Sequence, residues 1–587
     1  MSSLFRTKPL SCDDVGSSGA SSLKKDYTLS DLLAVGVGGT VGSGVFVLSG
    51  LIAADVGPAT PISFLIGGCC CIFSAASYAE LSERLPSSGA AYTFIYHTLG
   101  EFPAFLAAAM LTLEYGVAAA AVAVSWGDKL GLWLSSEMHV SAHSLKPLGL
   151  NVSASLLQLA CVLVLLMGVG ETKLVVNTAT VAKLALVGLM TLAGFMLLEP
   201  RFFSLSAFHG VTLRAILRGS MHSFFAFLGY DEVCFLSAES KSRHSLPAAV
   251  FLTLAIVTLL YFLSAVALVG MRERNSISRE SGFIEAFSSH GGFWSGFAQF
   301  VALGELVSLP LVVLISFLAQ PRLQYALALD GLLPRRFAQL DARGNLAFGI
   351  ITSGVLCVGL ALTVPFDWLD DVISAAVLCS FNLINASLIV LRKGRRRREG
   401  GAGEQQSWMC RAYSHVPPTI AHLLAFHAAA FVVTMVASLS TGSTPASDLL
   451  LCLLGSGVCL HSGIRLFLLP DDEEFAQEPG KFVSVSSSFP SRSDGTASAG
   501  SFRVFGVPWT PLAGSVINYI LLAQLHANCF FFLLVFFGCA AALYLFSSRL
   551  HSNLQPASPF HSPSASSSLD ASTSNILSKD FVDDDEA

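Results

Sequence analysis

The sequence predicts an all-α polytopic membrane protein with about fourteen transmembrane helices. Long apolar runs recur along its 587 residues, 53% of the residues are hydrophobic, and only 13% carry a charge. Soluble domains carry about a quarter charged residues. An apolar run of about 20 residues can cross the hydrocarbon core as a helix, whose backbone satisfies its own hydrogen bonds. Composition therefore decides the class of protein before any motif is considered.

The apolar runs divide the chain into a core, two additional helix pairs and polar segments. We expect residues 31–392 to form a ten-helix core, 418–470 to form helices 11 and 12, and 510–547 to form helices 13 and 14. Between them lie a basic loop (393–417) and a linker (471–509), and the Ser-, Pro- and acid-rich tails 1–26 and 550–587 are expected to be disordered. The candidate spans are 31–54, 58–80, 101–127, 152–170, 174–198, 215–237, 247–271, 295–322, 346–366, 370–392, 418–440, 447–470, 510–526 and 529–547. Residues 521–528 read either as a tight turn or as part of one long helix.

Basic residues orient the predicted spans. Lys24 and Lys25 precede the first span, and Arg395 to Arg398 follow the tenth. With an even number of spans, both clusters lie inside and both termini are cytoplasmic. The tripeptide Asn151-Val152-Ser153 is an N-glycosylation sequon in a predicted external loop. The polar stretch from Met1 to Asp26 lacks the early apolar core of a cleavable signal peptide, so we expect the first span to direct insertion.

No pattern in the sequence indicates an enzyme, a metal site or a cofactor. The 13 cysteines show no repeated CxxC spacing, and we interpret those in apolar runs as small, reduced, buried side chains. There is no nucleophile elbow and no phosphate-cradling loop. We therefore expect no catalytic residue, no cofactor, no metal and no nucleic-acid partner.

Glycines predict an interruption in the first span. Five of the nine residues from Gly36 to Gly44 are glycine, and each costs about 1 kcal/mol relative to alanine inside a helix. Non-helical backbone at mid-membrane depth persists only where it is buried in protein or lines a cavity. We predict a break around residues 38–44, where bare amides would attract a carboxylate and freed carbonyls an ammonium group. The alternative for the Gly38 to Gly42 spacing is a close helix-packing face.

A second break is predicted in the sixth span. An aromatic run, a glycine and two acids follow one another from Phe224 to Glu232. Paired interrupted helices at corresponding positions of two inverted repeats are the best sequence indication of a transport site. The repeat itself is not detectable as sequence identity, so this step is an inference.

Further motifs accompany the two predicted breaks. They are Gly57-Pro58-Ala59, Ile62 to Ile66, Tyr78-Ala79-Glu80-Leu81, Pro86 to Tyr92, Leu113-Glu114-Tyr115, Ala226 to Asp231, Pro321-Arg322 and Asp330 to Pro334. With Gly36 to Phe46, they resemble the cationic amino acid transporters of the amino acid–polyamine–organocation superfamily. The similarity runs from Asp31 to Leu391 and resumes from Phe505 to about Tyr544.

The resemblance implies a five-plus-five inverted-repeat core that works by alternating access, with discontinuous helices 1 and 6. It implies two sets of substrate-binding residues. The substrate carboxylate would be held at Thr40, Val41, Gly42, Ser43 and Gly44, and the amine at Val37 and near Ala226, Phe227 and Gly229. Gly39 departs from the family pattern, in which serine is common at this position.

Buried charges are further candidates, because a charged side chain at mid-membrane costs at least about 2.5–3.5 kcal/mol. In related transporters a lysine matching Lys183 reaches the broken first helix, so Lys183 is our candidate proton-coupling group; the alternative is a snorkelling lysine. Glu114 shares a helix face with Ala118, Ala121 and Ser125, and either faces the substrate or stabilises the bundle. Glu305 precedes Pro310 and either binds a cationic substrate side chain or lies in an outer vestibule.

Two residues beside the second break are candidates for gating. Tyr230 and Asp231 follow the glycine, and Asp231 either gates or bonds to the freed backbone. Glu232, the next residue, is less typical of the family.

The leading functional hypothesis is transport of L-amino acids, with arginine and lysine favoured, by uniport or proton-linked symport. The alternatives are a neutral amino acid or polyamine transporter of the same fold, and an amino-acid-sensing receptor that does not transport. The expected partners are an amino acid, protons and the lipid bilayer, and any partner subunit is left open. We expect the plasma membrane, with the vacuolar or lysosomal membrane as the alternative.

Overall fold

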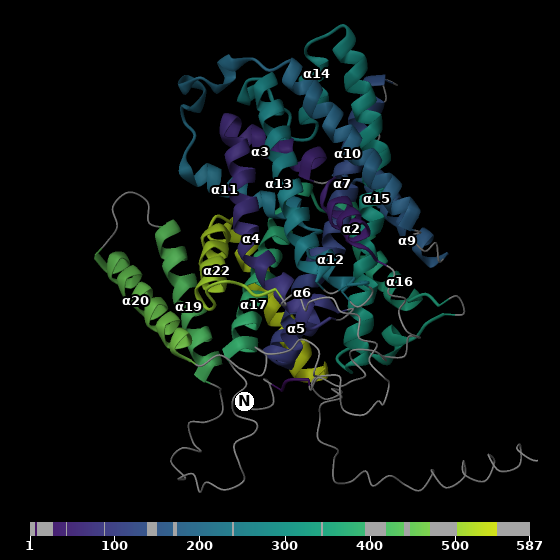
Figure 1. Ribbon diagram of the computed structural model, residues 1–587. Coiled ribbons are helices and arrows are strands. Elements are labelled where there is room, and N and C mark those ends of the chain that lie inside the picture. The colour runs from purple at the N-terminus through teal and green to yellow at the C-terminus, as the bar shows by residue number, and fades with distance from the viewer. Residues whose placement is uncertain are drawn as a thin grey trace, which may run out of the picture.

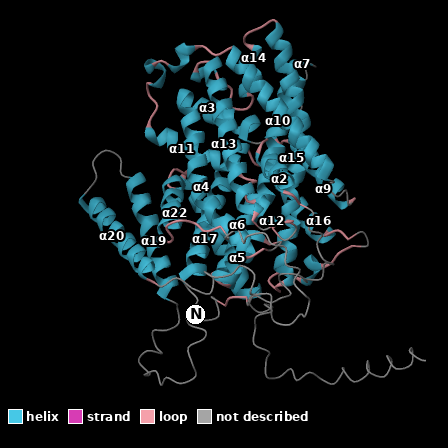
Figure 2. Cartoon of the chain, in the orientation of Figure 1, coloured by secondary structure: helices cyan, strands magenta, loops and turns pink. Residues whose placement is uncertain are grey.

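The computed structural model is helical throughout the part of the chain that it describes (Figures 1 and 2). It describes residues 6–8, 27–42, 44–86, 89–137, 149–167, 173–237, 240–242, 244–341, 344–393, 418–439, 446–469 and 502–548. Within these ranges the single β-type contact is an isolated parallel bridge between Tyr27 and Ser240. The predicted disordered tails and the basic loop 393–417 lie almost entirely outside the described residues, as does the linker up to residue 501.

The elements follow one another in chain order as a series of helices. They are α2 (Leu29–Thr40), η1 (Gly44–Leu48), α3 (Ser49–Val56), η2 (Gly57–Ala59), α4 (Thr60–Arg84), α5 (Ala90–Thr98), α6 (Glu101–Thr112), η3 (Leu113–Val117), α7 (Ala118–Glu137), α9 (Val152–Leu166), α10 (Lys173–Met196), η5 (Pro200–Phe203), η6 (Leu205–Phe208), α11 (Leu213–Phe227), α12 (Glu232–Phe235), α13 (Ser245–Met271), η7 (Arg274–Ser276), α14 (Gly282–Ser288), α15 (Phe293–Leu329), η8 (Arg335–Ala338), α16 (Ala347–Thr363), α17 (Phe366–Lys393), α19 (Pro418–Leu439), α20 (Ala446–Leu468), α22 (Trp509–Leu522), α23 (Ala527–Leu543) and η10 (Tyr544–Ser548). The turns η1, η3 and η10 are π-helical, and the other η turns are 3-10 helices.

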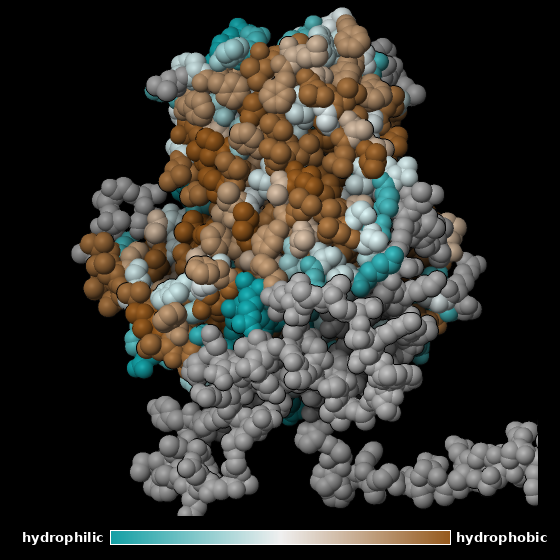
Figure 3. All heavy atoms as spheres, viewed as in Figure 1, coloured by the Kyte–Doolittle hydropathy of each residue, from teal (hydrophilic) through white to brown (hydrophobic). Residues whose placement is uncertain are grey.

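The helices have the length and apolarity of membrane spans. Among the described residues, eight helical stretches are long and apolar enough to cross a membrane, and four shorter apolar helices accompany them. Hydrophobic residues cover most of the visible flank of the helical body (Figure 3). The predicted class, a polytopic helical membrane protein, is therefore confirmed. The number of fourteen crossings and the inverted repeat stay predictions.

The first predicted break is present in the structure. A capping box starts α2: the Thr28 backbone N–H donates to the Asp31 carboxylate (3.0 Å), and the Asp31 N–H donates to the Thr28 hydroxyl (3.4 Å). The helix ends at Thr40, because Val41 turns to extended backbone with ψ 116°. Helical bonding resumes when the Phe46 N–H donates to the Gly42 carbonyl (3.0 Å) in η1. The predicted break is confirmed, and Gly38 in addition forms a close packing contact, since a Cβ atom there would lie 2.1 Å from the Thr180 hydroxyl oxygen.

The second break is present as well. Helix α11 begins at a Thr212 cap and ends at Phe227, after which Leu228 has ψ 136° and Gly229 has φ 122°. A short α12 follows from Glu232. Near the C-terminal end of the described chain, residues 523–526 form a turn between α22 and α23, so the tight-turn reading is confirmed there.

Both breaks lie inside one packed bundle. Helix α13 packs against α4, α2 and α10, and α11 packs against α4 and α17. Helices α19 and α20 pair with each other at one side of the bundle, where α22 connects them to α17 and α4 (Figure 1). The two interruptions are therefore enclosed by protein, as non-helical backbone at this depth requires.

Candidate functional site

The two interruptions touch each other at the centre of the bundle. A Cβ atom on Gly229 would lie 2.6 Å from the backbone nitrogen of Thr40. Backbone atoms cannot move away as a flexible side chain can, and a φ of 122° is itself a glycine conformation. Only a glycine at position 229 permits this approach, so the predicted site residue Gly229 has a defined structural role.

Three carbonyls at the breaks receive donors from side chains on other helices. The buried Tyr261 hydroxyl, from α13, lies 2.7 Å from the Thr40 carbonyl oxygen and 2.9 Å from that of Ala226. The Nζ of Lys183, from α10, donates to the Gly38 carbonyl oxygen (2.5 Å). A helix end leaves its last carbonyls without helical partners. Lys183 and Tyr261 therefore hold backbone oxygens that the breaks set free.

Tyr261 was not among the residues predicted from the sequence. It lies in an apolar span that carries no motif, so no local signal could have identified it. Two further expectations concern the same carbonyls. The carbonyl oxygen of Val37, predicted to bind the amine, instead accepts from the Val41 N–H (2.8 Å) within α2. Ala226 is at the second break as predicted. The ring of the next residue, Phe227, lies 5.5 Å from the Tyr261 ring.

The predicted carboxylate seat is closed in this conformation. Thr40, Val41, Gly42 and Gly44 are all buried, and Ser43 lies outside the described residues. A Cβ on Gly42 would lie 2.7 Å from the Val312 side chain, and one on Gly44 would lie 2.4 Å from the Tyr261 ring. Side chains therefore fill the space in front of these glycines, and the Thr40 hydroxyl donates to the Gly36 carbonyl (2.6 Å).

A small cavity opens one residue away, beside Gly39. Its lining includes Glu114 from η3, Glu232 from α12, Phe225 from α11 and Ser316 from α15. The cavity volume is about 20 Å³, which is room for about one water molecule. The centre of the bundle is thus occluded in this conformation, with no room for a molecule much larger than water.

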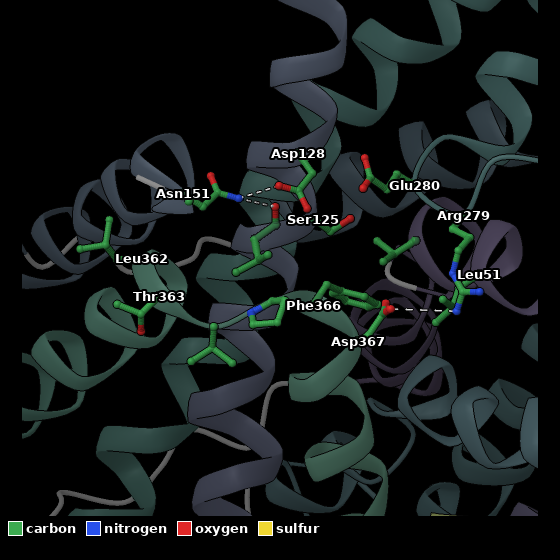
Figure 4. Close-up of a pocket in the computed structure, with 15 residues that line it drawn as sticks. Leu51, Ser125, Asp128, Asn151, Arg279, Glu280, Leu362, Thr363, Phe366 and Asp367 are labelled. Carbon is green, nitrogen blue, oxygen red and sulfur yellow. Dashed lines mark hydrogen bonds and ion pairs between the residues drawn. The ribbon is translucent and has the colours of Figure 1, made fainter. Parts of the chain in front are cut away.

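A larger cavity lies beside η1 and the first turn of α3, which contribute Val47 and Leu51 to its lining (Figure 4). It has a volume of about 430 Å³ and is lined by Asp128, Glu280, Asp367 and Arg279, among others. Arg279 lies 4.0 Å from Asp367 and 2.6 Å from Asp55 of α3. Three acidic side chains and one basic side chain therefore line this vestibule.

The predicted glycosylation site lines the same vestibule, and the structure corrects it. Asn151 is only 6% exposed. Its side-chain amide donates to Asp128 (2.7 Å), and its side-chain oxygen accepts from the Ala154 N–H (3.1 Å) as the cap of α9. Because Asn151 is buried and caps the start of α9, its side chain is not accessible for glycosylation.

Aromatic contacts separate the two cavities. Phe225 lines the small cavity and Phe366 lines the vestibule, and their ring centroids are 6.2 Å apart. Beyond the second break, Tyr230 packs against Tyr78 of α4 (6.2 Å) and Phe381 of α17 (5.9 Å). The occluded centre thus has aromatic layers next to it, and the predicted gating residue Tyr230 belongs to one of them.

Comparison with known proteins identifies the family. The profile of the family described as "Amino acid permease" matches residues 27–457. The chain belongs to the amino acid permease family. It is therefore a member of a family of transporters and not an enzyme, and the resemblance read from its motifs is confirmed.

The names of proteins similar to this permease refer to several different substrates. It is 31% identical over 403 residues to the "Methylthioribose transporter" of Bacillus subtilis (67% of this chain, 86% of that protein). It is 32% identical over 408 residues to "Cationic amino acid transporter 4" of Homo sapiens (66% and 62%). It is 30% identical over 407 residues to the "Branched-chain amino acid permease BcaP" of Bacillus subtilis (67% and 86%). The chain thus spans less than two thirds of the human relative's length.

The buried acids of this permease have distinct surroundings. Asp231 bonds to the backbone freed by the break, since its carboxylate accepts from the Gly229 N–H (3.1 Å) and from the Tyr115 hydroxyl (2.9 Å). Glu305 does not line the small cavity; it pairs with Lys129 of α7 at 2.7 Å. Glu114 does line the cavity, so of the two predicted specificity acids it alone faces the centre.

Proposed function

We propose that this permease carries L-amino acids across a membrane by alternating access and that it favours cationic ones such as arginine and lysine. The observation that carries the proposal is that two main-chain carbonyls, of Thr40 and Ala226, come together from the two interrupted helices at one donor, the Tyr261 hydroxyl. An α-ammonium group has three N–H donors. It would satisfy the two oxygens that the Tyr261 hydroxyl holds in this conformation.

The lining of the cavity supports a cationic substrate. Glu114 is 1% exposed, and its Oε1 atom has no hydrogen-bond partner among the described residues. A carboxylate in a low-dielectric site is costly unless a cation or donor pairs with it. The relatives do not select the substrate class by themselves, because their names include cationic amino acids, branched-chain amino acids and methylthioribose.

Alternating access would separate the helices that carry the breaks from the rest of the bundle. These are α2 with α3, α4, α11 with α12, and α13, which pack on one another. The Phe225–Phe366 and Tyr230–Phe381 contacts join this group to α17. We propose that these contacts open in turn, so that Tyr230 gates the site while Asp231 maintains the shape of the break.

Lys183 is the proposed proton-coupling residue. Its side chain is 2% exposed and bonds to the broken helix itself. A desolvated lysine can release its proton, and the neutral amine would hold the Gly38 carbonyl less strongly. In this proposal the protein lies in the plasma membrane. Both termini are in the cytoplasm, and the vestibule faces the outside of the cell.

Uptake into proteoliposomes tests the proposal. The purified permease is offered labelled arginine, lysine, alanine, leucine and a polyamine, with and without a pH gradient. Saturable uptake of arginine and lysine in preference to alanine and leucine is the expected result. Uptake restricted to neutral amino acids or to the polyamine would contradict the cationic assignment, and binding without uptake would indicate a sensing receptor.

A further inference from the structure

Helices α19 and α20 expose most of their surface at one side of the bundle (Figure 1). Only 17% of the apolar stretch of α20 is buried in the protein, against 89% for that of α17. Hydrophobic atoms cover much of this side in Figure 3, and the exposed side chains there include Leu424, Leu453, Leu460 and Ile464. On a membrane protein, an apolar surface of this kind contacts the acyl chains of lipids.

One end of this helix pair lies at the membrane surface that carries the basic residues. Lys393, the last residue of α17, donates from Nζ to the Leu469 carbonyl just after α20 (2.8 Å), and its own carbonyl accepts from the Thr419 hydroxyl of α19 (3.4 Å). The end of α17, the end of α20 and the start of α19 therefore meet. In the sequence, Arg395 to Arg398 follow directly after α17. Because basic residues gather on the cytoplasmic side, this is the cytoplasmic end in the proposed orientation.

Three basic side chains form a cluster at this end, His422 of α19 with His461 and Arg465 of α20. The ring centroids of the two histidines are 6.3 Å apart, and both His461 and Arg465 repel a positive charge on His422. His461 and Arg465 are exposed and lie one helical turn apart on the same face, and His422 is half-buried. Neither α19 nor the part of α20 after Asp448 contains an Asp or Glu residue. The two helices themselves therefore bring no negative charge to the cluster.

The cluster lies at the depth of the lipid headgroups. Helix α20 has 23 residues, and at 1.5 Å per residue it is about 35 Å long, which exceeds a hydrocarbon core of about 30 Å. Arg465 lies three residues before the last residue of α20, Leu468. The stem of an arginine side chain can stay beside acyl chains while its guanidinium reaches the headgroups. A guanidinium binds phosphate with two parallel hydrogen bonds, so a lipid phosphate suits this group.

We propose that His422, His461 and Arg465 bind the phosphate of an acidic phospholipid in the cytoplasmic leaflet, whose acyl chains lie on the exposed face of α19 and α20. The basic cluster matches the headgroup, and the leucines beside it match the chains. Phosphatidylcholine presents its phosphate together with a quaternary ammonium group, which the cluster would repel, so an acidic headgroup is favoured. This inference does not depend on which substrate the permease carries.

Native mass spectrometry of the detergent-purified protein tests the inference. Phosphatidylglycerol and phosphatidylcholine with the same acyl chains are titrated separately, and the Kd of each is obtained from the lipid-bound fraction. We expect Arg465→Gln to raise the Kd for phosphatidylglycerol about fivefold or more and the Kd for phosphatidylcholine less than about twofold. Arg465→Lys keeps the charge and should lose less than Arg465→Gln. The matched control is Arg335→Gln, which removes an exposed arginine of η8 and should change neither Kd.

Folding is checked by size-exclusion profile and thermal midpoint, and the double variant His422→Gln/His461→Gln decides the outcome if Arg465→Gln does not fold. An unchanged Kd for phosphatidylglycerol in a folded variant would overturn the inference, as would an equal loss in Arg335→Gln. Four acids, Asp471 to Glu474, follow α20 in the sequence. If the native protein prefers phosphatidylglycerol only after these four are replaced by their amides, the acids and not a lipid occupy the cluster, and the inference is wrong.

Discussion

The ammonium group of Lys129 lies 2.7 Å from the carboxylate of Glu305, and both side chains are less than 5% exposed. Lys129 also donates to the Glu280 carbonyl (2.8 Å), so it joins α7, α15 and the loop before α14. The pair thus stabilises the bundle at a place where the sequence alone suggested a substrate-binding acid.

Removal of one partner from this pair should therefore destabilise the protein. We expect Glu305→Gln to lower the thermal midpoint in detergent, because an uncompensated buried charge costs about 3–5 kcal/mol. The double variant Lys129→Met/Glu305→Leu should recover most of the loss. A Glu305→Gln protein that keeps its midpoint but loses arginine uptake and retains alanine uptake would instead assign Glu305 to the substrate.

Tyr261 should stabilise the protein in the absence of substrate. Tyr261→Phe keeps the ring against Phe227 and Phe64 but removes the hydroxyl that the Thr40 and Ala226 carbonyls share. A buried carbonyl left without a donor costs about 1–3 kcal/mol. We expect a lower thermal midpoint without substrate and a larger stabilisation on addition of lysine, whose amine would replace the lost donor. An equal response to lysine in the native protein and the variant would mean that substrate and hydroxyl do not share these oxygens.

Lys183 should make uptake depend on pH. If its proton is coupled to transport, uptake by the native protein rises as the external pH falls, since the protonated ammonium holds the Gly38 carbonyl. Lys183→Ala removes the titrating group and should give a flat pH profile. The measurement is the initial uptake rate in proteoliposomes at external pH values from about 5.5 to about 8, a range that a desolvated lysine can reach. Native uptake that does not change with pH would remove the reason for this assignment.

The sequence predicted those parts of the site that leave a local mark. Glycines at mid-span and an aromatic run followed by a glycine predicted both breaks. An interrupted helix needs residues that tolerate non-helical backbone at the interruption itself, so the signal is local. Contacts between distant helices leave no such mark. The partner of Glu305 lies 176 positions away at Lys129, and Tyr261 reaches Thr40 across 221 positions. The accessibility of the Asn151 sequon could not be predicted for a related reason, because the burial of Asn151 depends on how α9 packs against other helices.

Gly229 should tolerate no side chain. Gly229→Ala would place a methyl group 2.6 Å from the Thr40 backbone nitrogen, in a backbone conformation that alanine rarely adopts. We expect loss of at least about 90% of uptake by a protein that still inserts into the membrane, because the two breaks can no longer approach. The matched control is Gly538→Ala in α23, where an added Cβ would meet nothing within 4 Å. Uptake by Gly229→Ala equal to that of the control would show that contact between the breaks is not required.

The last residues of the predicted linker, 502–508, are attached to the helix bundle by two acids of α4. The Val504 N–H donates to the Glu80 carboxylate (2.7 Å), and the Phe502 N–H donates to that of Glu83 (2.9 Å). Glu80 also accepts from Arg392 of α17 (2.8 Å), and the Phe502 ring packs on Phe251 of α13 (5.5 Å). The segment therefore contacts α4 and α13, two helices of the group proposed to move, and Glu80 connects this attachment to α17.

Glu83→Ala should release this segment. A hydrogen bond to a charged group contributes about 1.5–3 kcal/mol, so we expect amide hydrogen exchange in a peptide covering residues 502–508 to become about tenfold faster or more. Exchange at the two breaks should stay unchanged, because neither acid contacts them. Glu285→Ala serves as the control for a lost carboxylate on another helix. Protection of residues 502–508 that is the same in all three proteins would mean that the packing of Phe502 on Phe251, and not the carboxylate, holds the segment in place.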